Sequence, residues 1–346
     1  MQALILAGGK GTRLRPLTVY TPKPIVPFGK RPFLLSQIET LQRAGITDII
    51  LSLNYQPGKI EQILEDGTNF GVTLRYLTEP TPMGTAGAFR YASDFLHTTT
   101  VVFNGDILTD LDLSTIIEEH KNRKATATIV LTEVENPSAY GLVETDVDGK
   151  ILRFLEKPNA EEIAKLNINT VNAGVYILEP QVLEMIPVGE NYSFEYGLFP
   201  DLLERGEAFF AHIAKDAYWL DIGTPQRYLQ AHHDLLAGKI KTFQDEPRRG
   251  TFESATSAEI DRTSLISDGC VIKSGARVLN SVLGAGVHVE EKAIIENSVI
   301  WAHTHVDTCA TIENSIVGRS CNIGRYVIAK NAILGDKTSL TDYTIV

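Results

Sequence analysis

The segment 6–18 (LAGGKGTRLRPLT) combines glycines with basic side chains in a pattern that suits phosphate binding, and Pro22-Lys23-Pro24 follows it closely. Glycine lets the backbone approach a ligand and adopt positive φ, so that successive N–H groups can converge on phosphate oxygens. Arg13 and Lys23 add positive charge beside those donors. The apolar run at 3–6 predicts a buried strand that opens into this loop. The segment is therefore predicted to bind a ligand that carries phosphate.

Two better-known phosphate motifs do not fit this segment. A Walker loop requires Lys followed by Ser or Thr, whereas Lys10 is followed by Gly11. A dinucleotide fingerprint that starts at Gly9 needs a third glycine where Leu14 stands, and the acidic residue expected about twenty positions later is missing. The glycines alone are equally typical of a surface turn, so the prediction depends on the segment as a whole.

Two aspartates follow apolar runs that are typical of strands. Asp106 ends the run 101–106 (VVFNGD), and Asp221 follows Trp219-Leu220 shortly before a helix predicted at about 226–236. An Asp after a strand is usually a cap or a turn residue, and Asp221 could equally cap the coming helix. From the residues alone, a structural role and a role at the ligand both stay open.

The first 120 residues predict elements that could hold these side chains. Apolar runs at 3–6, 48–53 and 73–77 indicate strands, and helical spacing at 32–44 and 57–64 indicates helices between them. This alternation predicts a doubly wound α/β sheet that is covered on both faces. Ligands of such sheets bind at the carboxyl ends of the strands, where the glycine loop falls.

From residue 125 to 178 the pattern changes to strands separated by turns. Three short sequences lie within it: Tyr140-Gly141, Glu156-Lys157-Pro158 and Asn172-Ala173-Gly174. Each alone could be a turn or the end of a strand.

From Thr263 onward the sequence repeats every 17 residues, and an Asn recurs at 280, 297, 314 and 331. Three aliphatic columns inside each short coil predict a triangular solenoid whose coils stack on one another. The columns are Leu265, Val282, Val299, Ile316, Ile333; Ile272, Val289, Val306, Ile323, Leu340; and Val278, Ile295, Ile312, Ala329, Val346.

The whole pattern resembles the sugar-nucleotidyltransferases, the nucleoside-diphosphate-sugar pyrophosphorylases, and the final columns resemble the hexapeptide-repeat left-handed β-helix. Among subfamilies it is most similar to GDP-mannose pyrophosphorylase, through the sequences at 84–87, 137–141, 154–158, 172–178 and 219–223. Two segments depart from that subfamily. Asn104-Gly105-Asp106 stands where Asn-Ser-Asp is more usual, and Ser193-Phe194-Glu195-Tyr196 stands where Ser-Ile-Glu-Lys is usual.

The resemblance implies a fold and a reaction. The expected fold is a Rossmann-like doubly wound mixed sheet over 1–238, a linker over 239–260, and a left-handed parallel β-helix of about five coils over 261–346. The expected reaction transfers a nucleotidyl group from a nucleoside triphosphate to a sugar 1-phosphate, most closely GTP with mannose 1-phosphate. UTP or dTTP with glucose 1-phosphate is the alternative. A non-catalytic regulatory subunit or an acyltransferase β-helix is an alternative of another class.

The resemblance also implies roles for individual residues. Arg13, Lys23, Asp106 and Asp221 would be catalytic, and the two aspartates would hold Mg²⁺. Glu156 and Asn172 would contact sugar hydroxyls, Gly141 would offer its backbone, and Lys157 would hold the sugar phosphate. The nucleotide would be bound by Ala7, Gly8, Gly9, Gly11, Thr12, Arg13, Lys23, Gly84 and Thr85.

The charge, the cysteines, the histidines and the apolar runs bear on the partners and the location of the protein. A net charge of −11 without a basic stripe argues against nucleic acid as a partner. The chain has three cysteines, Cys270, Cys309 and Cys321, and no two of them form a Cys-x-x-Cys motif. We therefore expect buried reduced thiols. The neighbours His232 and His233 would not face the same way on a helix, so they are expected at the surface or in packing. Without a leader or a run of eighteen apolar residues, we expect no membrane partner and a cytoplasmic protein, with the β-helix forming a homo-oligomer.

Overall fold

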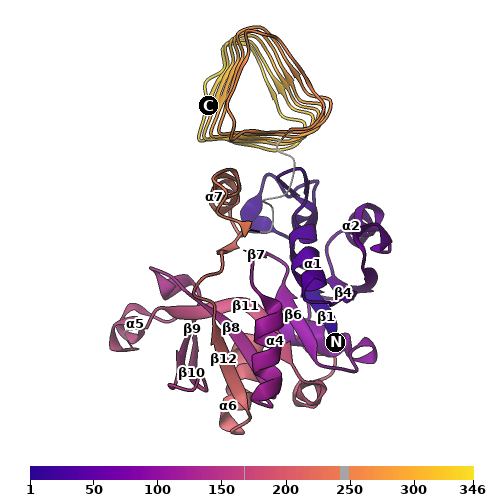
Figure 1. The fold of residues 1–346 in the computed structure, drawn as a ribbon, viewed down its shortest axis with the longest axis vertical. Coiled ribbons are helices and arrows are strands. Elements are labelled where there is room, and N and C mark those ends of the chain that lie inside the picture. Colours follow the sequence, from indigo (N-terminus) through magenta and orange to yellow (C-terminus); the bar gives the residue numbers. More distant parts are fainter. Residues whose placement is uncertain (167, 242–248) are drawn as a thin grey trace. The chain divides into compact units, whose positions relative to one another are not determined.

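The structure, a computed structural model, describes residues 1–166, 168–241 and 249–346 (Figure 1). The chain divides into two compact units. Unit 1 comprises Met1–Gly9 and Ser36–Trp219, and unit 2 comprises Lys10–Leu35 and Leu220–Val346. The division falls inside the predicted phosphate loop, because its first two glycines belong to unit 1 and Arg13 belongs to unit 2.

Unit 1 contains a mixed sheet whose first strands are parallel to one another. They follow the order β6-β1-β4-β5 across the sheet. Ala3, Leu4 and Ile5 are fully buried, because a strand inside a parallel sheet is covered on both faces and reads as a continuous apolar run. The bounds of these strands are Gln2–Leu6 (β1), Asp48–Leu53 (β4), Thr73–Thr78 (β5) and Thr100–Asn104 (β6).

Helices connect these strands, as the alternating pattern predicted. They are α1 (Leu34–Arg43), α2 (Pro57–Leu64), α3 (Gly84–Tyr91) and α4 (Leu113–Asn122). In α4 the side chain of Asp112 accepts a hydrogen bond from the N–H of Ser114 at 3.1 Å, which caps the helix. Its buried residues recur at helical spacing and form one apolar stripe: Leu113, Ile116, Ile117 and His120. The predicted doubly wound α/β fold is confirmed.

The other strands add an antiparallel half to the sheet, which makes it mixed. β11 (Thr170–Leu178) runs antiparallel to β6 and also to β8. The register between β11 and β8 shifts between Asn172 and Tyr176, and such a bulge redirects the side chains beside it. The remaining elements are β8 (Ala127–Glu133), β9 (Gly141–Thr145), β10 (Ile151–Glu156), α5 (Ala160–Leu166), α6 (Phe199–Glu204) and β12 (Phe209–Ile213).

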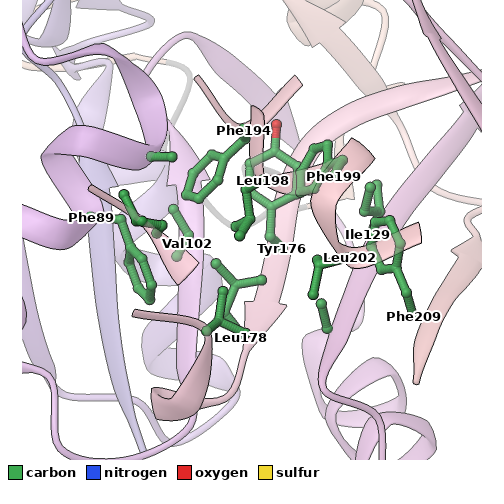
Figure 2. Close-up of a cluster of buried hydrophobic side chains, with 14 of the residues drawn as sticks. Phe89, Val102, Ile129, Tyr176, Leu178, Phe194, Leu198, Phe199, Leu202 and Phe209 are labelled. Carbon is green, nitrogen blue, oxygen red and sulfur yellow. The ribbon is translucent and has the colours of Figure 1, made fainter. Parts of the chain in front are cut away.

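An aromatic cluster forms the core between the antiparallel half and the segment that follows it (Figure 2). Tyr176 of β11 packs against Phe194 and Phe199, with ring centroids 5.2 and 5.3 Å apart, and Phe199 also meets Phe209 at 5.4 Å. Aromatic pairs at such distances add to the free energy of burial. Phe194 begins a single turn of π-helix, Phe194–Leu198. The core therefore fixes the backbone that carries Glu195.

Residues from 249 onward form the β-helix of unit 2, which Figure 1 shows as a stack of triangular coils. Parallel pairing joins residues 17 apart, for example Val278 with Ile295 and Ile295 with Ile312. The recurring asparagines have positive φ between 44° and 52°, a conformation that Asn tolerates better than most residues. Asn280 donates to Oδ1 of Asn297 across neighbouring coils at 2.7 Å.

Each side of the triangle is one parallel sheet of short strands. The β14 sheet contains Glu253–Ser254 (β14), Val271–Ile272 (β17), His288–Val289 (β20), His305–Val306 (β23), Asn322–Ile323 (β26) and Ser339–Leu340 (β29). The β15 sheet contains Glu259–Ile260 (β15), Arg277–Leu279 (β18), Ile294–Glu296 (β21), Thr311–Glu313 (β24) and Ile328–Lys330 (β27). The β16 sheet contains Leu265–Ile266 (β16), Val282–Leu283 (β19), Val299–Ile300 (β22), Ile316–Val317 (β25) and Ile333–Leu334 (β28). β14 and β15 fall within 239–260, so the ladders start inside the range expected to be a linker, of which 242–248 lie outside the described residues.

The first predicted column is wrong by one residue. The interior of the coils is filled by Ile266, Leu283, Ile300 and Val317, not by the residue before each of them. Successive residues of a strand face opposite sides, so Leu265 and its equivalents point outward, and yet Leu265, Val282, Val299 and Ile316 are buried to 4% exposure or less. The outer face of the β16 sheet is therefore covered.

Contacts on that side identify what covers it. Trp301, next to β22, donates from Nε1 to the hydroxyl of Tyr228 at 3.0 Å. Tyr228 lies in α7 (Pro225–Leu236). Nε2 of His233 in the same helix lies 3.0 Å from the carbonyl oxygen of Asn297. The ammonium of Lys337 lies 5.7 Å from the ring centroid of Tyr20. α7 and the segment 10–35 thus dock on the β16 sheet.

Three further findings bear on the sequence analysis. His232 is fully buried in α7, where Nε2 lies 3.3 Å from the N–H of Gly29, so it is a packing residue as predicted. Cys270 and Cys321 are buried free thiols, whereas Cys309 is only partly buried. No helix among the described residues is long and apolar enough to cross a membrane.

Candidate active site

Glu79 joins the two segments of unit 1 that were expected to bind the nucleotide. Its carboxylate is 8% exposed and accepts hydrogen bonds from Oγ of Ser52 at 2.8 Å and from the N–H of Met83 at 3.1 Å. A Cβ added at Gly8 would lie 3.1 Å from Oε1 of the same side chain. Glu79 therefore fixes the start of α3 beside the glycine loop. Sequence reasoning missed this role, although an acidic residue at the end of β5 was a usable signal.

The glycine loop begins where β1 ends. The N–H of Ala7 donates to the carbonyl of Ser52 at 2.9 Å, which extends the ladder with β4 by one residue. A Cβ added at Gly9 would meet no described atom within 4 Å. The backbone at Gly9 is thus open to a ligand, whereas Gly8 is packed against Glu79.

Asp106 lies in the turn between β6 and β7 (Ile107–Thr109). The N–H of Gly105 donates to the carbonyl of Leu6 at 2.9 Å. A Cβ at position 105 would lie only 2.6 Å from that oxygen and 3.1 Å from Cα of Ala7. Gly105 thus lets the Asp106 turn approach the end of β1, and Asp106 lies beside the start of the glycine loop.

The loop before α3 is closely packed against the segment around Tyr192. Gly84 has a φ of +73°, and a Cβ there would lie 2.6 Å from the carbonyl oxygen of Tyr192. A Cβ at Gly87 would lie 2.6 Å from the carbonyl oxygen of Glu190. The N–H groups of Ala86 and Gly87 both donate to Tyr192. These glycines therefore serve close backbone packing.

Thr85 is neither a helix cap nor directed away from the protein. Its hydroxyl accepts from the N–H of Phe194 at 2.8 Å and donates to Oε2 of Glu195 at 3.1 Å. Oγ of Ser193 donates to the same carboxylate oxygen at 2.5 Å. Thr85 therefore ties the expected nucleotide loop to Glu195.

The residues expected to bind the sugar phosphate come together in unit 1. Gly141 and Glu156 are paired across β9 and β10, and a Cβ at Gly141 would lie 2.8 Å from Oε2 of Glu156. Lys157 follows at the end of β10, where its N–H donates to the carbonyl of Tyr140 at 3.1 Å. Glycine at 141 thus leaves room for the Glu156 carboxylate.

Asn172 is oriented by β11 and its bulge. Its amide nitrogen donates to the Tyr176 hydroxyl at 3.0 Å, and its amide oxygen accepts from the N–H of Gly174 at 2.9 Å. The amide nitrogen of Asn104 donates to the same hydroxyl at 3.3 Å. The carbonyl of Ala173 accepts from Nε1 of Trp219 at 2.8 Å. Polar groups from β6, β11 and β13 (Trp219–Asp221) therefore share this part of unit 1.

Glu195 belongs to this group as well. Burial, and then the negative charge of Glu195, raise the pKa of Glu156, while Lys157 lowers it. Burial and Glu195 also raise the pKa of the Tyr176 hydroxyl well above its usual value. Two carboxylates that interact in a partly buried place are suited to accepting hydrogen bonds from hydroxyl groups. Sequence reasoning recorded Glu195 only as part of a departure from the subfamily.

In unit 2, Gly11 brings Lys23 to the phosphate loop. Gly11 has a φ of +62° and precedes a short 3₁₀ turn, Thr12–Leu14, that carries Arg13. A Cβ at Gly11 would lie 3.0 Å from Cβ of Lys23. The Thr18 hydroxyl donates to the carbonyl of Gly11 at 2.7 Å and fixes the turn. Lys23 is 9% exposed and begins a second 3₁₀ turn, Lys23–Ile25, ahead of β2 (Pro27–Phe28) and β3 (Arg31–Pro32).

Asp221 and Arg13 meet at Gly223. A Cβ at Gly223 would lie 2.9 Å from Oδ2 of Asp221 and 3.2 Å from Nη2 of Arg13. Asp221 also forms an ion pair with Arg227 in the first turn of α7, which sequence reasoning missed. The cap of α7 is Thr224, whose side chain accepts from the N–H of Arg227 at 3.3 Å. Thr224 therefore takes the cap position, and Asp221 belongs to a charged cluster.

Comparison with known proteins identifies two families in the chain. Residues 2–238 match the family described as Nucleotidyl transferase, and residues 247–342 match the one described as GlmU-like, C-terminal hexapeptide. The second match agrees with the parallel coils and confirms the hexapeptide-repeat left-handed β-helix.

Curated relatives agree with the first match. A mannose-1-phosphate guanylyltransferase of Mycobacterium tuberculosis is 34% identical, over 80% of this chain and 76% of its own. A mannose-1-phosphate guanyltransferase of Yarrowia lipolytica is 38% identical, over 77% and 73%. A UTP–glucose-1-phosphate uridylyltransferase of Synechocystis sp. is 36% identical, over 82% of each chain.

A solved structure agrees too. A Bacillus anthracis protein assigned as a glucose-1-phosphate thymidylyltransferase, crystallised with sucrose, superposes with a TM-score of 0.61 at 27% identity. The match covers 67% of this chain and 93% of that one. The chain therefore belongs to the nucleotidyl transferase family and is a sugar-1-phosphate nucleotidyltransferase.

Proposed function

We propose that this chain transfers the guanylyl group of GTP to mannose 1-phosphate and releases pyrophosphate, forming GDP-mannose. The observation that carries the proposal is the similarity to mannose-1-phosphate guanylyltransferases over about three quarters of both chains. The uridylyltransferase relative matches over 82% of each chain. UTP or dTTP with glucose 1-phosphate therefore remains the competing pair.

The reaction requires neutralisation of the negative phosphate charges rather than a general base. A phosphate monoester has a second pKa of about 6, so the sugar phosphate is already ionised at neutral pH and can attack the α-phosphorus directly. The obstacle is the approach of two polyanions, which calls for positioning and for positive charge. Arg13 and Lys23 supply such charge at the loop that Gly11 shapes. We assign Arg13 to the departing pyrophosphate, Lys23 to the triphosphate and Lys157 to the sugar phosphate.

Asp106 and Asp221 are proposed to hold Mg²⁺. Carboxylate oxygens are the ligands that this ion prefers, and Asp221 already lies among charged groups. The donor set therefore fits the ion, provided that Arg227 releases Asp221 when the ion binds. Bound Mg²⁺ would neutralise charge on the reacting phosphates. Arg227 would then hold Asp221 in place while the ion is absent.

The other residue roles also remain proposals. The triphosphate would contact Ala7, Gly8, Gly9, Gly11, Thr12, Gly84 and Thr85, and the sugar would contact Gly141, Glu156 and Asn172. The hydrogen bonds around Asn172 and the paired Glu156 and Glu195 support a site that recognises hydroxyl groups. The domain division at 1–238, 239–260 and 261–346, a homo-oligomer and a cytoplasmic location likewise stay predictions.

A panel of substrates tests the proposal. The measurement is kcat/KM for GTP, UTP, dTTP, ATP and CTP, each with mannose 1-phosphate and glucose 1-phosphate. We expect GTP with mannose 1-phosphate to be preferred, because a site that pairs with one base leaves its own polar groups unpaired with another. A preference of more than about tenfold for UTP or dTTP with glucose 1-phosphate would replace the guanylyl assignment and leave the family unchanged.

A further inference from the structure

Two histidines and a glutamate share the outer face of the β14 sheet. His288 of β20 pairs in register with His305 of β23, and Val289 pairs with Val306. Both valines are fully buried in the interior of the coils. Because side chains alternate along a strand, both histidines point outward, and Glu290, two residues after His288, lies on the same side. The three side chains therefore come from two successive coils of the β-helix.

The distances bring their ligand atoms together. One nitrogen or oxygen from each of the three side chains lies within 4.8 Å of the others. Nε2 of His305 is 3.9 Å from Oε1 of Glu290, and the two imidazole centroids are 6.2 Å apart. Among the described residues, this is the one group of three His, Cys, Asp or Glu side chains that meets this distance.

Small side-chain rotations would bring three ligands of a tetrahedral coordination sphere to bonding distance. Zinc binds His nitrogen and carboxylate oxygen at about 2.0–2.2 Å, which places tetrahedral ligand atoms about 3.4 Å apart. His288 is exposed, and Glu290 and His305 are partly exposed, so their side chains have room to turn inward by the remaining distance. Their backbones are held by the ladder: the N–H of His288 donates to Thr304 at 3.0 Å and that of Glu290 to Val306 at 2.9 Å.

The donor set also discriminates between metals. Two imidazoles and one carboxylate suit Zn²⁺ and its neighbours, whereas Mg²⁺ prefers oxygen ligands throughout. The equivalent positions in the adjacent coils carry other residues. Lys273 and Asp307 stand at the position of Glu290, and Asn322 stands at the position of His305. We propose that His288, Glu290 and His305 bind a divalent transition-metal ion, best Zn²⁺, which links two successive coils. This site is separate from the carboxylates assigned to catalysis.

Zinc binding to the full-length protein tests the proposal. After treatment with a chelator and desalting, the protein is titrated with ZnCl₂ by calorimetry, with Mg²⁺ in millimolar excess to occupy oxygen-ligand sites. We expect about one Zn²⁺ per chain and a rise in Tm, since a ligand that binds only the folded state stabilises it. Co²⁺ in place of Zn²⁺ should give visible absorption bands typical of nitrogen and oxygen coordination.

Matched variants locate the ion. His305→Asn places at this position the residue that the next coil already has, Asn322, so the coil should still fold. His305→Asn and Glu290→Gln should each weaken Zn²⁺ binding at least about tenfold, because even outer-shell changes cost that much at metal sites. The control is His303→Asn, an exposed histidine of the same coil whose φ of 59° suits Asn. Zinc binding that is absent in the wild type, or equal in the wild type and His305→Asn, overturns the proposal.

Discussion

A side chain at Gly223, two residues after Asp221, would crowd two charged groups. An added Cβ at Gly223 would lie 2.9 Å from the Asp221 carboxylate and 3.2 Å from the Arg13 guanidinium. Both atoms are the far ends of flexible side chains, and Gly223 is not among the glycines with positive φ. Alanine would thus fit the backbone but displace the two charged groups. The glycine keeps a cation and a carboxylate close together without a side chain between them.

We therefore expect Gly223→Ala to lower kcat by at least about tenfold with little change in Tm, because misplacing catalytic groups by about 1 Å is costly. Steady-state kinetics and thermal unfolding measure the two effects. Gly58→Ala is the control, since a Cβ there meets no described atom within 4 Å and the residue lies in α2. Normal turnover in Gly223→Ala would show that the contacts around residue 223 are not used in catalysis.

Substitution of the two proposed magnesium ligands, Asp106 and Asp221, should have a larger effect on turnover. Asp106→Asn and Asp221→Asn should each lower turnover by at least about a hundredfold, because each removes a charge beside the reacting phosphates. Asp112→Asn is the matched control, since Asp112 caps α4 and Asn caps helices equally well. Circular dichroism should find all three variants folded. A folded Asp221→Asn enzyme with full activity would leave Asp221 only its pairing with Arg227.

Residue types and spacing predicted the phosphate loop, and the family resemblance implied roles for the two aspartates and the sugar-side motifs, but neither pointed to Glu79, Glu195 or Arg227. Glu79 and Glu195 act through neighbours that are distant in sequence, whereas Arg227 pairs with Asp221, 6 residues before it. Glu79 touches Ser52, and Glu195 touches Thr85, which lies 110 positions away. A charged residue on its own is usually a solvated surface residue. Only the folded chain reveals that these carboxylates and this guanidinium have specific partners.

At the scale of elements, α7 packs against the segment 10–35 through His232. The Nδ1–H of this buried ring faces the carbonyl of Tyr228 at 2.9 Å, and Nε2 accepts from the N–H of Gly29 at 3.3 Å. Burial lowers the pKa of His232 to about 4. The histidine is therefore neutral in the folded protein at neutral pH and becomes charged more readily when the chain unfolds.

This difference predicts a dependence of stability on pH. Well above pH 6.5, the ordinary pKa of histidine, His232 is neutral in both states and contributes no pH dependence. As the pH falls from about 6.5 towards 4, the unfolded state takes up the proton first, and the free energy of unfolding should fall by up to about 3 kcal/mol. Urea unfolding between pH 4 and 7 measures this slope. His232→Gln should flatten it, whereas His97→Gln, an exposed histidine, should not; equal slopes would contradict the assignment.

The positions of most helices and strands could be predicted from the sequence, because an apolar run indicates a strand that is covered on both faces. Predicted bounds at 48–53 and 57–64 agree with β4 and α2. The β-helix shows the limit of that signal. Both residues of β16, Leu265 and Ile266, are aliphatic and buried, so periodicity alone could not tell which one faces the interior. The outer residue is buried by another part of the chain, which no repeat can reveal.

At the scale of the molecule, unit 2 combines the segment 10–35, α7 and the β-helix. The Trp301 indole donates to the Tyr228 hydroxyl, and that hydroxyl donates to the carbonyl of Pro27. Farther along, the Thr21 hydroxyl lies 3.4 Å from Oδ2 of Asp336. The β-helix therefore braces the segment that carries Arg13 and Lys23, in addition to any role in assembly.

This arrangement predicts that residues 1–240 need the β-helix for full activity and stability. A chain shortened to residues 1–240 would expose Tyr228, which is fully buried in the whole protein, and would lose the partners of Thr21 and Tyr20. We expect it to be at least about tenfold less active and to unfold at a lower temperature, since small displacements of positioning segments lower turnover strongly.

Trp301→Ala should also destabilise the protein and lower its free energy of unfolding by about 3–5 kcal/mol, as for other buried aromatic residues. Trp301→Phe keeps an aromatic ring but removes part of its volume and the hydrogen bond to Tyr228, and should cost less, about 1–3 kcal/mol. Full activity and an unchanged Tm in the shortened chain would mean that the catalytic segment holds its conformation without the coils, and that the buried outer column of the β16 sheet serves the stability of the β-helix alone.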